Sequence, residues 1–434
     1  MLCLSAVSSL PRTNEAESIM TPDRPHVVAI LPGIIPSTLM DIVQPLLHLD
    51  GTGEIKFHLM VEQYPTVGLI GGMDLVVFCR NAEPRYQYLD LVLERGCPFI
   101  YDLDDNLFEV PLDSVDGQYY SDPERAELIR RYLRSADLVR VYSKTLVELV
   151  KPLNPKVQEM VPPLDWRLYQ SQTRESRDGP VRIVYATSRR DDYLFTVFDE
   201  ALVQILDKYS DRVEVYFWGF HPPSYSQRAN VHFLDFTYNY EQYARQLSSM
   251  GFDIGLAPLL DDRFHRSKTN TKFREYGACG IAGIYSDVEV YARWVEDHKT
   301  GLLVPNTPQA WFAALETLIT DSALRQTIGQ AAREKVRQTF STENFAVVWK
   351  EQIRQSLEDA RRAASPETAQ LSNKGAASKT EPGRKTFYRD WLVSKARRAI
   401  IILREGGLGA AWYHVRFHTN NLWWLFKVNL LKRT

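Results

Sequence analysis

The sequence predicts an α/β protein of two Rossmann-like domains that face each other across a cleft, followed by a helical C-terminal tail. From His26 onward, short runs of β-branched and aromatic residues alternate with longer amphipathic runs. This alternation is typical of a parallel sheet covered by helices. The same alternation starts again after the polar stretch 171–180. The chain has 434 residues, enough for about three units of ~150 residues.

Each half contains six expected strands, each a short apolar run bounded by polar residues, glycine or proline. Those of the first half are HVVAIL (26–31), KFHLM (56–60), DLVVFC (74–79), CPFIYDL (97–103), DLVRVYS (137–143) and KVQEMV (156–161). Those of the second half are VRIVYAT (181–187), VEVYFWG (213–219), VHFLDF (231–236), FDIGLAP (252–258), GIAGIYS (280–286) and GLLVP (301–305).

Helical patterns separate several of these strands, and three more follow the second half at 308–319, 322–340 and 341–364. The stretch 365–383 is rich in Pro, Gly, Ser and Lys and has almost no large apolar residues, so we expect a disordered linker. The expected organisation is a disordered leader (1–25), a first domain (26–170), a second domain (180–340), a crossing helix (341–364), the linker (365–383) and a basic, aromatic, amphipathic tail (384–434).

Composition narrows the class of protein. A net charge of −2 gives no general attraction to nucleic acid, and the four cysteines have neither C-x-x-C spacing nor a paired framework. Reduced thiols in the cytoplasm are therefore expected, rather than disulfides or a structural zinc site. No apolar run reaches the ~20 residues that span a bilayer, and the N-terminus lacks the positive region of a secretory signal.

The stretch KTNTKFREYGACG, from Lys268 to Gly280, predicts an anion site. If 270–279 is helical, Lys268, Lys272 and Glu275 lie near one face at the start of the helix. The helix follows a loop after an expected strand, so its free N–H groups and positive dipole end point into the cleft. Two lysines there suit a diphosphate, and Glu275 is placed to accept hydrogen bonds from a ribose diol. The expected ligand is a nucleotide-diphosphate sugar.

The region 272–319 resembles the donor-binding region of family 4 glycosyltransferases (glycosyl transferases group 1) of the GT-B fold. The matching pieces are E-Y-G-A-C-G at 275–280, IAGIYS, HKTGLLV and the helix from Pro308. A looser likeness covers about 26–360, and IYDLDDNLFEVP resembles a stretch of a bacterial subset. The resemblance implies a nucleotide-sugar donor and retention of anomeric configuration, and it places Glu275 at the second Glu of the family's Glu-x7-Glu motif. The first Glu position holds Ser267, and the family's glycine loop keeps Gly33 alone.

Two other groups of polar residues follow expected strands. Thr187, Ser188 and Arg189 are candidates for phosphate contacts from the opposite wall of the cleft, although Arg189 and Arg190 before two aspartates also suit a helix start. For the run 102–105, three interpretations stay open: a metal site at Asp102 and Asp104, a cap for the following loop, or a catalytic role on the acceptor side for Asp104 or Asp105. His265 is expected to be exposed and inert.

The tail 384–434 holds eleven Lys and Arg against Asp390 and Glu405, and four of the nine tryptophans. Trp with Lys and Arg on short amphipathic helices is typical of an interfacial membrane anchor, although a helical hairpin packed on the body is also possible. An anchor suits a lipid-linked acceptor at the inner face of the cell membrane.

The sequence therefore predicts a glycosyltransferase that moves a sugar from a nucleotide-diphosphate donor to a glycan or lipid-linked acceptor, as in polysaccharide biosynthesis. We expect lysines and a helix dipole to stabilise the leaving diphosphate, with no metal and no cofactor. The alternatives are a nucleotide-sugar epimerase of the same fold and an inactive donor-binding scaffold subunit.

Overall fold

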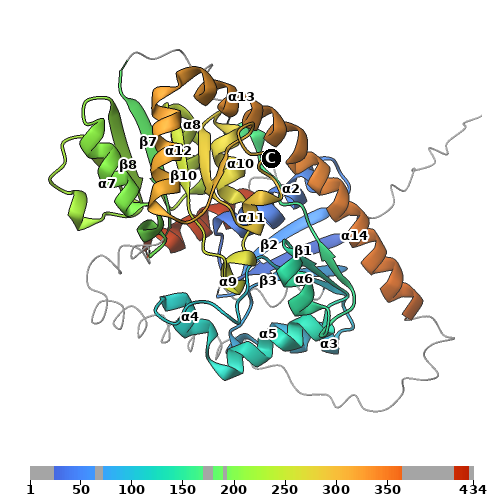
Figure 1. Ribbon diagram of the computed structural model, residues 1–434. Helices are drawn as coiled ribbons and strands as arrows, with labels where there is room; N and C mark the ends of the chain where they lie inside the picture. Colours follow the sequence, from blue (N-terminus) through green and yellow to red (C-terminus); the bar gives the residue numbers. More distant parts are fainter. Residues whose placement is uncertain (1–23, 64–71, 170–178, 189–192, 364–414, 430–434) are drawn as a thin grey trace, which may run out of the picture.

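The computed structural model describes residues 24–63, 72–169, 179–188, 193–363 and 415–429. They form two α/β domains, each built on a six-stranded parallel sheet (Figure 1). The predicted fold class is confirmed. The expected leader and the linker 365–383 lie outside the described residues, apart from Arg24 and Pro25 of the leader, and of the tail only 415–429 is described.

The first sheet has the order β2-β1-β3-β4-β5-β6. Strands β1 to β5 are mostly apolar and buried, as expected for a parallel sheet covered on both faces, whereas the edge strand β6 is partly exposed. The strands are β1 His26–Leu31, β2 Lys56–Val61, β3 Leu75–Cys79, β4 Phe99–Leu103, β5 Leu138–Val141 and β6 Val157–Glu159. The helices are α1 Pro36–Thr38, the π-helical turn Leu39–Val43, α2 Gln44–Gly51, α3 Tyr88–Glu94, α4 Val115–Tyr120, α5 Pro123–Ser135 and α6 Lys144–Val150.

The second sheet has the order β12-β11-β10-β7-β8-β9. Its strands are β7 Val181–Ala186, β8 Val213–Trp218, β9 Val231–Leu234, β10 Ile254–Ala257, β11 Ala282–Ser286 and β12 Leu302–Val304. All twelve predicted strands are confirmed. The helices are α7 Asp199–Lys208, α8 Tyr240–Ser249, α9 Arg263–Arg266, α10 Thr271–Ala278, α11 Glu289–Ala292, α12 Pro308–Thr320 and α13 Ser322–Thr339.

Helix α14, Thr342–Ala363, runs from the second domain along the first (Figure 1). Its buried face contains Trp349, whose indole N–H donates to the Asp41 carbonyl over 2.8 Å. The Gln352 carbonyl oxygen accepts from Arg140 on β5 over 2.6 Å. Helix α14 is therefore anchored in the core of the first domain, and this fixes the two domains to each other.

Residues 415–429 form a further helix, which we call the C-terminal helix. It packs on both domains: Asn420 and Asn421 bond the backbone of Ile34 in the first domain, and Lys427 pairs with Glu241 in the second. Among the described residues, no helix is long and apolar enough to cross a membrane.

Candidate functional site

The two sheets place their switch points opposite each other. In the second sheet, β7 and β10 lie side by side, and the strands that follow them in the chain lie on opposite sides, β8 and β9 beyond β7, and β11 and β12 beyond β10. Open α/β sheets bind ligands at such a switch point. The loop after β7 carries Thr187 and Ser188, and the loop after β10 leads to α10. In the first sheet, β1 and β3 form the equivalent point, followed by Gly33 and by Arg80.

Glu275 is buried on α10, with 2% of its surface exposed. One of its carboxylate oxygens accepts from Lys272 Nζ at 2.8 Å and from the Tyr243 hydroxyl at 3.1 Å. The i,i+3 ion pair that the spacing suggests therefore forms inside the domain instead of on its surface. Lys272 and Tyr243 therefore fix the orientation of the Glu275 carboxylate.

Lys268 crosses the cleft. Its Nζ lies 2.5 Å from the Asp105 carboxylate, which belongs to the loop after β4 in the first domain. The same ammonium group lies 3.9 Å from the centre of the Phe264 ring. A lysine that we predicted to bind a phosphate thus contacts, in the ligand-free protein, a carboxylate that we predicted to be catalytic.

Asp104 has a different partner from Asp105. Arg80 binds it with two hydrogen bonds, Nε to Oδ1 at 2.6 Å and Nη2 to Oδ2 at 2.9 Å. Burial raises the pKa of the Asp104 carboxyl, but the charge and hydrogen bonds of Arg80 outweigh burial, so the pKa lies below its ordinary value. A carboxylate held in this way is a weak base.

Arg80 is a site residue that the sequence reasoning missed. Its φ is +58°, in the left-handed region that side chains other than glycine seldom adopt. Strained backbone of this kind is concentrated at functional sites. Arg80 also lies 3.7 Å from Asp105. The available signal was its position directly after β3, at the edge of the sheet where ligands bind.

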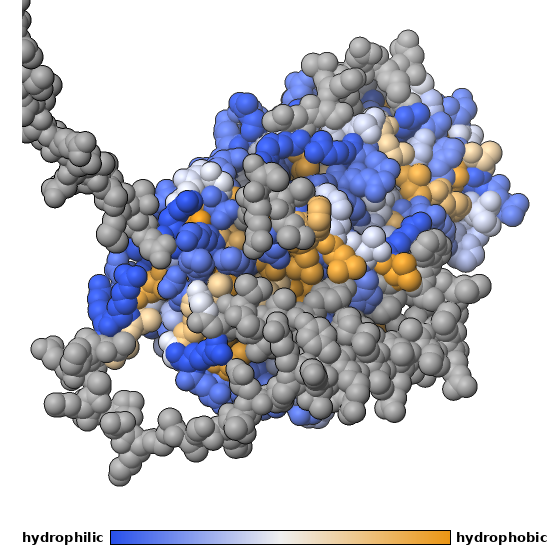
Figure 2. Space-filling view, turned by 180° about the vertical axis from the view of Figure 1, so that it is seen from behind, coloured by the Kyte–Doolittle hydropathy of each residue, from blue (hydrophilic) through white to orange (hydrophobic). Residues whose placement is uncertain are grey.

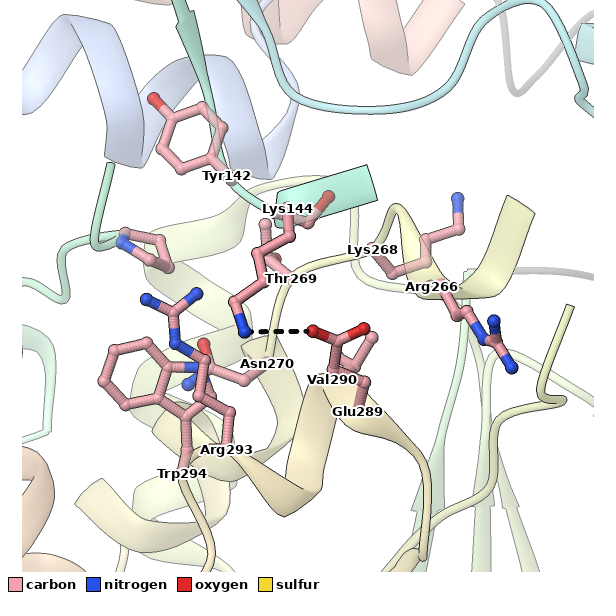
Figure 3. A pocket seen from close by; sticks show the side chains of 12 residues that line it. Tyr142, Lys144, Arg266, Lys268, Thr269, Asn270, Glu289, Val290, Arg293 and Trp294 are labelled. Atoms are coloured by element: carbon pink, nitrogen blue, oxygen red, sulfur yellow. Dashed lines mark ion pairs between the residues drawn. The ribbon is translucent and has the colours of Figure 1, made fainter. Parts of the chain in front are cut away.

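A pocket opens at the N-terminus of α10, where the two domains meet (Figure 3). Lys144 of the first domain and Glu289 of the second point toward each other there, with Nζ 3.7 Å from the carboxylate. The lining residues are Tyr142, Ser143, Lys144, Pro162, Arg266, Lys268, Thr269, Asn270, Glu289, Val290, Arg293 and Trp294. Four of them are cationic and one is acidic.

Asn270 is the buried polar residue of this pocket, with 2% of its surface exposed. Its side-chain oxygen accepts from Arg274 Nε at 3.0 Å. In the described part of the chain, its amide Nδ2 has no hydrogen-bond partner. The oxygen is engaged, so the free donor of the side chain and the first N–H groups of α10 are both available to an anion.

The cations of the pocket have carboxylate partners in the absence of a ligand. Arg266 pairs with Asp261 at 2.7 Å, and Arg293 pairs with Glu159 of the first domain. Bound anions must therefore compete with carboxylates, most of which are partly exposed and readily hydrated.

The prediction that His265 is exposed was wrong, because the residue is buried with 2% of its surface exposed. Its Nδ1 lies 2.7 Å from Asp262, and its Nε2 lies 2.8 Å from the Tyr193 hydroxyl. These contacts hold α9 against the segment after the β7 loop. Ser267, which is fully buried, donates its hydroxyl to the Arg263 carbonyl. Both residues therefore position Lys268 in this structure.

The remaining predicted residues have distinct positions. Thr187 and Ser188 lie at the switch point, and Gly219, with φ +85°, passes so close to the Thr187 carbonyl that a Cβ would lie 2.1 Å from it. Gly33 is buried against the Phe417 ring of the C-terminal helix. Arg189 lies outside the described residues.

Asp102 and Asp104 each bind an arginine. Asp102 is fully buried on β4 and accepts from Arg140 Nε at 3.0 Å and from the Tyr142 hydroxyl at 2.8 Å. Within the residues that the structure describes, no group of three or more His, Cys, Asp or Glu is close enough to hold a metal ion.

Two Rossmann-like domains with facing switch points define the GT-B architecture, and the chain has this fold. Residues 182–321 match the family model described as glycosyl transferases group 1. The matched residues lie in the second domain, and over this part of the chain the match to a glycosyltransferase family confirms the resemblance seen in the sequence. A comparison with curated proteins finds no match.

Solved structures support the fold. Sucrose-phosphate synthase of Thermosynechococcus elongatus aligns with a TM-score of 0.55 and 16% identity over 77% of this chain and 100% of the other. HepE of Anabaena, solved with UDP and glucose, aligns at 0.53 and 14%, over 75% and 99%. A Listeria monocytogenes protein assigned as a UDP-N-acetylglucosamine 2-epimerase aligns at 0.51 and 12%, over 77% and 97%. At these identities the likeness shows the fold.

Proposed function

We propose that the protein transfers a sugar from a nucleotide-diphosphate sugar to a glycan or lipid-linked acceptor, with the diphosphate bound at the N-terminus of α10. The observation that carries the proposal is the pocket there, where Asn270 keeps a free donor among cationic side chains. The family match over the same domain supports a sugar donor. The UDP bound to HepE supports a uridine nucleotide as the first donor to test.

In the proposed reaction, the bond between the anomeric carbon and the diphosphate oxygen breaks, and its electron pair leaves with the diphosphate. An acceptor hydroxyl forms the new bond to the anomeric carbon on the same face that the diphosphate leaves, and it gives up its proton. Lys268, Asn270 and the dipole of α10 stabilise the charge that develops on the leaving group. Asp105 is the proposed proton acceptor, once the diphosphate has drawn Lys268 away from it.

We further propose that the reaction retains anomeric configuration and needs neither a metal ion nor a cofactor. Positive charge for the diphosphate is already available from lysine and arginine side chains and from the helix. Activity is expected to survive EDTA. Loss of turnover on chelation, with recovery on adding Mn²⁺, would refute this part of the proposal.

The site is tested by replacing Lys268 or Lys272 with alanine. Each variant is expected to bind UDP about ten- to a hundredfold more weakly, because a hydrogen bond to a charged group contributes ~1.5–3 kcal/mol. Thermal shift with UDP, GDP, ADP and TDP measures binding, and circular dichroism checks the fold. If both variants bound UDP as tightly as the wild type, the assignment of the anion site to the N-terminus of α10 would be wrong.

Product analysis separates this function from the two alternatives. A glycosyltransferase without acceptor is expected to release UDP slowly by hydrolysis, whereas an epimerase yields a free epimerised nucleotide sugar. A scaffold subunit binds the donor and leaves it intact. Peripheral attachment at the inner face of the cell membrane, through 384–434, belongs to the same proposal because it suits a lipid-linked acceptor.

A further inference from the structure

The C-terminal helix has a docked face of buried side chains. Trp424 has 2% of its surface exposed, and Val428 and Asn421 have none. The Asn421 side chain accepts from the Ile34 N–H at 2.9 Å, and Asn429 bonds both the N–H and the carbonyl of Leu59. Leu59 belongs to β2, an edge strand of the first sheet, so Asn429 satisfies backbone groups that an edge strand leaves open.

The docked face lies against the loop after β1, at the switch point of the first sheet. Phe417 covers Gly33, in the loop directly after β1. On the other side, Asn420 accepts from Asn239, and Lys427 pairs with Glu241 at the start of α8. Helix α8 also supplies Tyr243, which holds Glu275. The C-terminal helix therefore joins the rims of both domains beside the proposed donor site.

The opposite face of this helix is apolar and exposed. Leu422, Trp423 and Phe426 have 54%, 43% and 52% of their surface exposed, and we call these three residues the outer stripe. Val415, about two to three turns N-terminal to them, is 52% exposed as well. Viewed from behind, the molecule shows apolar side chains gathered near its centre (Figure 2). A soluble surface seldom collects large apolar side chains on one helical face without a partner.

We propose that the outer stripe docks on an anionic lipid surface and holds the mouth of the cleft against the membrane. Charge complementarity selects this partner: residues 384–434, which contain the helix, carry eleven Lys and Arg against two acidic residues. Near a negative membrane surface each such cation contributes to binding, and Trp and Phe enter the headgroup region. The membrane contact itself does not depend on the proposed function. Only its purpose, which is access to a lipid-linked acceptor, rests on that function.

The proposal differs from an anchor that is free of the body. Trp424 and the three asparagines tie the helix to both domains, so the membrane contact has a fixed orientation relative to the cleft. Of the two adjacent tryptophans, Trp424 packs against the protein, and Trp423 contacts the lipid surface in this proposal.

The test compares vesicle binding of three full-length proteins: the wild type, the outer-stripe variant L422S/W423S/F426S, and a control variant L112S/V115S. Leu112 and Val115 are 66% and 84% exposed, ahead of and at the start of α4, so the control removes exposed apolar surface elsewhere. Each protein is sedimented with vesicles of phosphatidylcholine mixed with phosphatidylglycerol, and with phosphatidylcholine alone. A UDP thermal shift checks the donor site independently.

The wild type and the control are expected to bind the anionic vesicles equally, and the outer-stripe variant at least about tenfold more weakly, with an unchanged UDP shift. Raised salt is expected to weaken wild-type binding without abolishing it. Equal binding by all three, no binding by the wild type, or an equal loss in the control would overturn the proposal. The proposal would also be overturned if the wild type were a dimer that does not bind vesicles and the outer-stripe variant were a monomer. Loss of the UDP shift in the wild type would count against the proposed function instead.

Discussion

At the scale of single residues, the contact between Lys268 and Asp105 decides which charges the cleft offers to a diphosphate. The two side chains come from different domains, and each is mostly shielded from solvent, at 23% and 12% exposure. Asp105 also lies near Arg80, so it keeps a cationic neighbour when Lys268 leaves it. An ion pair thus joins the two sides of the ligand-free cleft. A diphosphate carries more negative charge than one carboxylate, so it is able to replace Asp105 as the partner of Lys268.

Asp105→Asn is expected to raise UDP affinity by about two- to fivefold, because Lys268 loses the carboxylate that competes with the ligand. The same change is expected to lower turnover, because the proposed proton acceptor is gone. Titration calorimetry and a UDP-release assay measure the two effects. Asp207→Asn, which removes an exposed carboxylate paired with Arg228 far along the second domain, is the control. Weaker UDP binding in Asp105→Asn would show that Asp105 supports the donor site directly.

Several of these residues were predictable from sequence, and their partners were not. Lys272 and Glu275 follow from helical spacing, and Lys268 follows from its place in the loop between an expected strand and that helix. Arg80 and Asn270 do not, because a positive φ and an unpaired amide depend on how distant segments pack. His265 was misjudged for the same reason: its partners Asp262 and Tyr193 lie on two separate segments, and only the fold brings Tyr193 to the ring.

At the scale of elements, a buried polar network connects the first sheet to α14. Arg140 on β5 binds Asp102 on β4 and Gln352 on α14, and its guanidinium lies 3.5 Å from the centre of the Trp349 ring. Burial raises the pKa of the Asp102 carboxyl to about 7, outweighing the opposite effect of Arg140. The junction between the crossing helix and the sheet is therefore sensitive to pH.

The sign of that sensitivity follows from the pKa shift. The folded protein binds the Asp102 proton more tightly than the unfolded chain, whose carboxyl has the ordinary value of 3.8. The stability that protonation gives is therefore fully present at low pH and is lost as pH rises to about 7. As pH rises from about 4 to about 7, the free energy of unfolding is expected to fall less for Asp102→Asn than for the wild type. Urea unfolding across this range measures the difference. Parallel curves for the two proteins would contradict the assignment.

The C-terminal helix offers a matched pair of substitutions. Trp424→Ala is expected to lower the free energy of unfolding by ~3–5 kcal/mol, because it leaves a cavity between the helix and the domains. Trp423→Ala, which removes the exposed neighbouring ring, is expected to change it by less than ~1 kcal/mol. Denaturant unfolding measures both. Equal losses would mean that the helix is not docked through Trp424.

The elements were easier to predict than their arrangement. All twelve strands follow from apolar runs bounded by turn residues, because a strand buried on both faces leaves a local mark in the sequence. The docking of 415–429 leaves no such mark. Its asparagines satisfy the backbone of Ile34 and Leu59, more than 350 positions away, and nothing in the composition of a basic, aromatic tail separates a docked face from an exposed one.

At the scale of the whole molecule, the proposed reaction depends on contacts that cross between domains. Lys268 with Asp105, Lys144 with Glu289 and Arg263 with Glu109 all join the two halves at the cleft. Helix α14 and the C-terminal helix hold the halves together away from these pairs. The pairs Lys144–Glu289 and Arg263–Glu109 are exposed and therefore weak, whereas the helices are anchored in cores. Ligand binding can thus rearrange the cleft without unfolding its frame.

The central claim is that the N-terminus of α10 binds the diphosphate of a sugar donor that the enzyme cleaves. The most direct measurement is UDP release from UDP-glucose, and from a panel of other nucleotide sugars, by the wild type and by Lys268→Ala with Asp207→Asn as control. The account predicts release by the wild type and the control from at least one donor, and at least about tenfold less by Lys268→Ala. Release that is unchanged in Lys268→Ala, or donors that stay intact although they bind, would contradict it.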